Sequence, residues 1–382
     1  MGIERLAKNV ISLLATSAVA ILIGGCASKP GGAQHAGHGT THGGAGFLAP
    51  IRLLPEATGN HSWPVSTHSE IAQAYFDQGI QLRYAYGVDE AARSFRAAYK
   101  ADPNCAICYW GEAYALGAYL NGALTTEKAP HALAAIRKAA ELAPRHASPM
   151  ERDLIDATLV RYVENFDPSN RRQQDQAFAE AMNAVYEKYP EHLDIAAITA
   201  SAWFVLEERR GTRELDDPNV VRIHTILEKA LAQDIRHPGA CHLYIHATES
   251  TVEPERALPC AEFLGSAIPG ASHINHMPSH TWNEVGDWGR SVRANLRAWH
   301  SDLKASVDAG VAIYPTHNLH MLLFAASYDG QGAIAVRAGR DYARLNGDTM
   351  HLALTLVRFG RFDEVSELGA RPSGDVGGAV WD

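Results

Sequence analysis

The chain has 382 residues, a formal net charge of −9 at pH 7 and 20% charged residues. It is acidic and contains no block of lysine and arginine, which argues against binding to a nucleic-acid backbone. Its length allows two ordinary domains or one long solenoid of helical hairpins.

The first 25 residues predict an export signal. Arg5 and Lys8 give a positive end, and an apolar run follows from Val10 to Ile23. The Ile-Gly-Gly-Cys segment ending at Cys26 resembles the lipobox of bacterial lipoproteins, in which the cysteine is lipidated. This resemblance implies a cell-envelope protein held by a lipid anchor, and Ala27 favours the outer membrane facing the periplasm. The alternative is a transmembrane helix, but the run is short for one.

Residues 26–65 are predicted to form a flexible tether. Glycine, alanine, threonine and histidine dominate it, and no apolar period is present from Ser28 to Gly46. His35, His38 and His42 lie in this stretch, where they either hold metal ions loosely or serve as polar spacers.

From Ile71 onward, apolar residues recur at helical spacing between short breaks of glycine, proline, asparagine and aspartate. The first hairpin, from Ile71 to Asp102, has a turn at Gly87 and closes with Pro103. Similar hairpins follow at residues 110–144, 150–190, 196–234, 241–269, 273–300, 317–345 and 350–368.

The turn glycine, the small residues early in the second helix and the closing proline resemble the tetratricopeptide repeat (TPR), whose period is 34 residues. The resemblance covers residues 66–368 and is strongest at 238–345. It implies an all-α, right-handed solenoid of TPR-like hairpins, assigned here to residues 66–382.

Four cysteines follow Cys26, and outside the cytoplasm disulfides are favoured. Cys105 and Cys108 predict a local disulfide or packed thiols, because Tyr109 stands where haem attachment needs a histidine. Cys241 and Cys260 fall on paired helices of one hairpin, where a disulfide would brace His242.

The histidines provide the clearest functional pattern. His242 and His246 are spaced i, i+4 and therefore share one helix face. The same pair recurs 34 residues later as His276 and His280. Equivalent helices stack side by side in a repeat protein, so these four imidazoles should meet.

Aligning the turns at Val252, Gly286 and Gly330 extends this pattern. It places His320 in register with His242 and His276, and His273 in register with His317. In TPR proteins the first helix of each hairpin lines the concave groove. The predicted metal ligands in this groove are therefore His242, His246, His276, His280, His317 and His320.

Imidazole binds copper, zinc, nickel and iron, and the affinity order places copper ahead of zinc. Glu249 lies one turn beyond His246 and is the catalytic candidate: a ligand, a carboxylate that orients a histidine, or a general base. Pro278 lies between His276 and His280, where it either kinks the helix or begins it.

These patterns predict an extracytoplasmic metal-binding TPR lipoprotein with a multi-histidine site, and leave open whether it is an enzyme. An alternative is a non-enzymatic scaffold that holds a partner peptide in the groove through histidine hydrogen bonds. A third is a passive metal buffer, which would bind metal without turnover. A scaffold would contain no stoichiometric metal.

Overall fold

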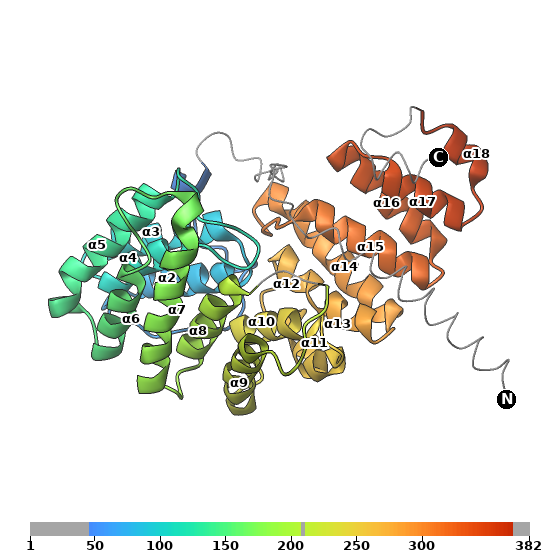
Figure 1. The fold of residues 1–382 in the computed structure, drawn as a ribbon. Coiled ribbons are helices and arrows are strands. Elements are labelled where there is room, and N and C mark those ends of the chain that lie inside the picture. The colour runs from blue at the N-terminus through green and yellow to red at the C-terminus, as the bar shows by residue number, and fades with distance from the viewer. Residues whose placement is uncertain (1–45, 208–210, 370–382) are drawn as a thin grey trace, which may run out of the picture.

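The computed structural model describes residues 46–207 and 211–369, so the export signal, Cys26 and the histidines at 35, 38 and 42 lie outside the described residues. All regular elements within these two ranges are helices, and consecutive helices pack into hairpins that stack along a curved array (Figure 1). The predicted all-α solenoid of helical hairpins is confirmed.

The α-helices run, in chain order, α2 Glu70–Tyr84, α3 Val88–Ala101, α4 Ala106–Leu116, α5 Ala129–His146, α6 Pro149–Leu159, α7 Arg171–Lys188, α8 Leu193–Leu206, α9 Pro218–Gln233, α10 Pro238–Thr248, α11 Leu258–Leu264, α12 Ser272–His276, α13 Pro278–Glu284, α14 Trp288–Lys304, α15 Pro315–Tyr328, α16 Gly332–Asn346, α17 Met350–Arg358 and α18 Phe362–Ser366. Short 3-10 turns lie at Gly46–Leu48, Pro168–Asn170, Pro254–Ala257 and Ala305–Val307.

Local sequence signals set the helix ends. Ser148 and Glu151 form a reciprocal capping box at the start of α6, satisfying two backbone donors that the helix leaves free. Gly286 and Gly330 adopt φ of 78° and 72° at the turns after α13 and α15, a left-handed conformation that glycine adopts without a Cβ clash. Pro278 is the first residue of α13, so it begins that helix directly after α12 ends at His276.

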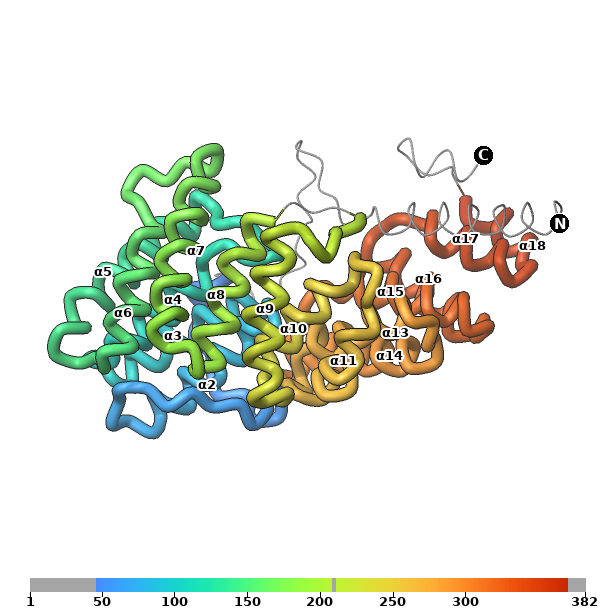
Figure 2. Tube along the Cα trace, turned by 60° about the horizontal axis from the view of Figure 1, so that its bottom comes forward, coloured from blue at the N-terminus to red at the C-terminus, as the bar shows by residue number. Residues whose placement is uncertain are grey.

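The first hairpin contacts α10, far along the chain (Figure 2). The ring of Tyr84, at the end of α2, lies so close to Gly239 that an added Cβ would meet it at 2.7 Å. Only glycine allows this approach of α2 to α10. One large apolar core runs through this contact, from Phe47 to Ile313.

The described part of the predicted tether differs from the expectation. Residues 46–65 pack on the helices, with Phe47 and Trp63 only 3% and 2% exposed. Ala57 also accepts a backbone hydrogen bond from Gly270 at 3.0 Å. The glycine- and histidine-rich composition ends near residue 46, and the apolar residues beyond it drive this packing.

Both predicted cysteine pairs are bonded in the structure. Cys105 and Cys108 join at the start of α4, and Cys241 and Cys260 link α10 to α11 with their Cα atoms 4.9 Å apart. Among the described helices, none has the length and apolar character needed to cross a membrane.

Candidate metal centre

Six histidines from four helices form two adjoining groups of three. Their nitrogen atoms lie within 4.8 Å of one another in each group. The inner triad comprises His242 and His246 from α10 and His273 from α12. The outer triad comprises His276 from α12, His280 from α13 and His317 from α15.

In the inner triad, the Nδ1 atoms of the α10 histidines are held by acceptors. Nδ1 of His242 donates to the carbonyl oxygen of Tyr84 at 2.5 Å, and Nδ1 of His246 donates to Oε1 of Glu249 at 2.9 Å. These bonds fix the tautomer and leave Nε2 as the atom with a lone pair. Nε2 of His242 and both ring nitrogens of His273 are buried without a hydrogen-bond partner among the described residues.

The outer triad follows the same design. Nδ1 of His276 lies 2.7 Å from Oδ1 of Asn295, whose amide nitrogen donates to the carbonyl of Ser291 and so fixes which amide atom faces the ring. Nδ1 of His280 lies 2.6 Å from Oε2 of Glu249. Glu249 therefore contacts one histidine of each triad through its two oxygens, which fits the orienting role among its three candidate roles.

This arrangement brings two lone pairs together. The Nε2 atoms of His276 and His280 are 2.8 Å apart, and each faces the other from a ring whose Nδ1 lies against an oxygen acceptor. Two lone pairs at this distance repel unless a proton or a metal cation lies between them. Metal–imidazole bonds of about 2.0–2.1 Å would place two such nitrogens roughly 3.3 Å apart around one tetrahedral ion. A small opening of the pair admits a metal ion.

Burial keeps the imidazoles of His242, His273, His276 and His317 neutral, which is the form that binds metal. Desolvation and the neighbouring imidazoles hold the pKa of His242, His273 and His276 well below the usual range. The same causes lower the pKa of His317 to about 3. Burial alone would raise the pKa of Glu249, but His280 and His246 lower it well below its ordinary value, so it is a carboxylate.

The structure changes two parts of the predicted ligand set. His320 lies outside both triads, against His351 at a ring-centroid distance of 4.2 Å, whereas His273 completes the inner triad. The rings of His242 and His273 are 4.9 Å apart, and those of His276 and His317 are 4.7 Å apart. In each triad, the histidine from the following repeat therefore lies one helical turn earlier than the in-register alignment predicts. His273 takes the place expected for His276, and His317 takes the place expected for His320.

The inner triad and His276 also do not line an open groove. The side chains of His242, His246, His273 and His276 are 0–3% exposed. Tyr86, directly after α2, covers the inner triad with its ring 4.3 Å from that of His242. For the inner triad and His276 the burial differs from the groove prediction, because the first hairpin folds back onto α10, a contact that no repeat pattern encodes.

A third group, which the sequence did not reveal, surrounds Asp194 in α8. Its Oδ1 lies 2.9 Å from Nε2 of His61, 3.2 Å from Nε2 of His237 and 2.7 Å from the Tyr84 hydroxyl. Nδ1 of His237 accepts the backbone N–H of Ala240, so its Nε2 carries the proton and offers no lone pair to a metal. This network instead fixes Tyr84, whose carbonyl orients His242.

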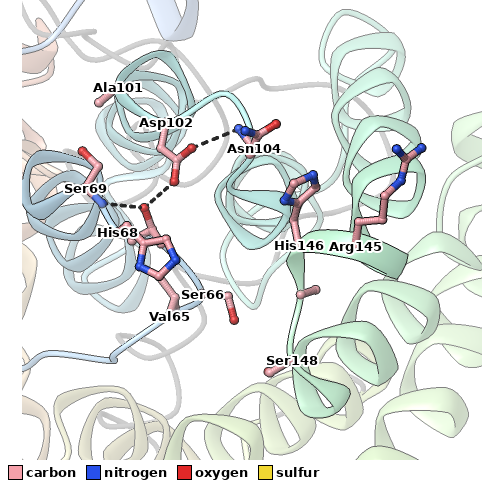
Figure 3. A pocket seen from close by; sticks show the side chains of 12 residues that line it. Val65, Ser66, His68, Ser69, Ala101, Asp102, Asn104, Arg145, His146 and Ser148 are labelled. Atoms are coloured by element: carbon pink, nitrogen blue, oxygen red, sulfur yellow. Dashed lines mark hydrogen bonds between the residues drawn. The ribbon is translucent and has the colours of Figure 1, made fainter.

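A surface pocket of about 960 Å³ lies elsewhere, between the starts of α2 and α6 (Figure 3). Its polar groups largely pair with each other: the Thr67 hydroxyl donates to Asp102, and the backbone N–H of Asn104 does the same. The pocket contains no member of either histidine triad.

Fold and site together define an all-α, helical-hairpin protein with a buried six-histidine centre. No protein-family model matches the chain, and no curated protein matches it either. Among solved structures, it is similar to the crystal structure of the P58(IPK) TPR domain, at 14% identity and a TM-score of 0.20, over 78% of this chain and 89% of that chain. The fold assignment here rests on the hairpins of the chain itself.

Proposed function

We propose that this protein is a metal-binding protein of the cell envelope that holds two transition-metal ions, one in each histidine triad. Copper is the first choice and zinc the second, because imidazole donors bind late first-row ions in that order. Three protein ligands per ion is also the number that catalytic zinc sites use, leaving a coordination position for a further ligand.

The main observation behind this proposal is that four of the imidazole rings share one orientation. Nδ1 lies against an oxygen acceptor in His242, His246, His276 and His280, while the Nε2 atoms of His276 and His280 converge at 2.8 Å. A purely structural histidine would have its lone pair satisfied by a donor, since an unpaired buried polar atom is costly. Metal ligands characteristically have a fixed Nδ1 and a free Nε2.

The rival scaffold function draws on the fold, because helical-hairpin solenoids present extended surfaces to other proteins. Burial of the inner triad and of His276 counts against histidine contacts to a peptide in a groove. A partner protein remains compatible with the rest of the surface. The two disulfides support an oxidising compartment for the proposed envelope location.

The test is metal content by inductively coupled plasma mass spectrometry on the purified full-length protein, after loading with copper or zinc and desalting. We expect about two ions per chain in the wild type. His242→Ala and His317→Ala should each retain about one, because each removes one of three ligands from a single triad.

His320→Ala is the matched control, since His320 is a histidine of the same region that lies outside both triads. It should retain both ions. Absence of stoichiometric metal in the wild type would refute the proposal. If His320→Ala lost as much bound metal as His242→Ala or His317→Ala, the triads would not be the binding site.

A further inference from the structure

The two triads differ in their access to solvent. His242, His246 and His273 are 1%, 3% and 1% exposed. In the outer triad, the His280 side chain is 18% exposed, and Glu249 beside it is 20% exposed. An ion in the outer triad would therefore lie close to water, whereas an ion in the inner triad would be enclosed.

Two tyrosines cover the inner triad, and both adopt an unfavourable backbone conformation. Tyr86 and Tyr314 have φ of 65° and 56°, a left-handed conformation in which the Cβ of a side-chain-bearing residue crowds the backbone. Both rings contact the ring of His273, at centroid distances of 5.4 and 5.1 Å. The strained backbone at both positions thus serves to place an aromatic cover on the inner triad.

This cover is held in place from outside. The hydroxyl of Tyr314 lies 2.8 Å from that of Tyr119, and the Tyr119 ring packs 4.8 Å from Tyr86. Tyr119 therefore joins the two covering tyrosines into one unit. Among the described residues, no tyrosine of this unit makes a ring contact with the outer triad, whose rings contact each other and the inner triad.

Charge indicates what the open side would bind. Among the described residues, Glu249 is the carboxylate that pairs with the six imidazoles, through His246 and His280. Even with Glu284, which interacts electrostatically with His280 and Glu249, two divalent ions would leave positive charge uncompensated. Net charge in a low-dielectric interior is strongly unfavourable unless counter-charge is bound.

We propose that the ion in the outer triad binds a small anion from solvent at its open coordination position, whereas the ion in the inner triad is closed to external ligands. This inference rests on the proposed two-ion function and assigns substrate or hydroxide access to the side of His280 and His317. The inner ion keeps only its protein ligands, whereas the outer ion exchanges its external ligand with solvent.

The test uses azide as the probe anion and the full-length protein loaded with two equivalents of Cu(II). Azide should produce a ligand-to-metal charge-transfer band in the wild type and in His242→Ala, which keeps the outer triad. The band should be lost in His317→Ala, which keeps only the inner triad. His320→Ala should behave as the wild type.

A second measurement needs no variant. A chelator added to the wild type should remove copper in two phases of equal amplitude, with the azide response disappearing in the fast phase. An azide band that persists in folded His317→Ala, or that is absent from protein carrying two copper ions, would overturn this inference alone. Failure to bind either copper or zinc would instead overturn the proposed function together with it.

Discussion

At the residue scale, Glu249 connects the two triads. Its two oxygens contact Nδ1 of His246 and Nδ1 of His280 at 2.9 and 2.6 Å. Each contact requires an acceptor oxygen, and only the ionised carboxylate offers an acceptor at both positions. A general-base role would require a free oxygen near a reacting group, so the observed geometry favours positioning of the imidazoles.

Glu249→Gln should therefore weaken both metal sites at once. The amide nitrogen of glutamine would face one of the two Nδ1–H donors, forcing that ring to turn or change tautomer. We expect the affinity for both ions to fall about 10- to 100-fold, as for other residues that orient metal ligands. Competition titration with a chromophoric chelator measures this.

Glu284→Gln provides the control for that variant. Glu284 is exposed and lies at the end of α13. Among the described residues it has no hydrogen bond or ion pair with the six histidines and interacts with His280 and Glu249 only through space. The affinity of the Glu284→Gln variant for both ions should stay within about twofold of the wild type. If Glu249→Gln also retains wild-type affinity, the orienting role assigned to the carboxylate is wrong.

At the element scale, the disulfide between α10 and α11 supports the inner triad. Cys241 precedes His242, a proposed ligand, and its partner Cys260 is 19 residues away. Closing a loop of this size stabilises a fold by about 3 kcal/mol. The Cys241→Ala/Cys260→Ala variant should lose about that much unfolding free energy and bind the inner ion more weakly.

Cys105→Ala/Cys108→Ala is the comparison, because that disulfide spans only three residues and lies at the start of α4. Chemical denaturation of the metal-free proteins should show a clearly smaller loss for this pair. A larger loss there than in the Cys241 pair would contradict the predicted role of the α10–α11 link.

Helical periodicity identified the hairpins because each helix carries its own apolar face and breaks. The predicted helix from His317 to Tyr328, for example, is observed as Pro315–Tyr328. The one-turn stagger between neighbouring helices could not be read from the repeat, since it depends on how side chains interlock between them. For that reason His320 was included and His273 omitted.

At the scale of the whole molecule, the site depends on a contact that a linear repeat array lacks. In a simple solenoid each repeat touches only its neighbours. Here the end of α2 reaches α10, and the Tyr84 carbonyl bonds to His242 across 158 residues of sequence. This closure buries the histidines and converts a repeated surface pattern into an enclosed centre.

The most direct test of the two-ion centre is a crystal structure of the copper-loaded protein with anomalous diffraction at the copper absorption edge. Two anomalous peaks are expected, one among His242, His246 and His273 and one among His276, His280 and His317. A single peak would contradict the two-ion account. Peaks confined to other histidines would refute the six-histidine centre itself.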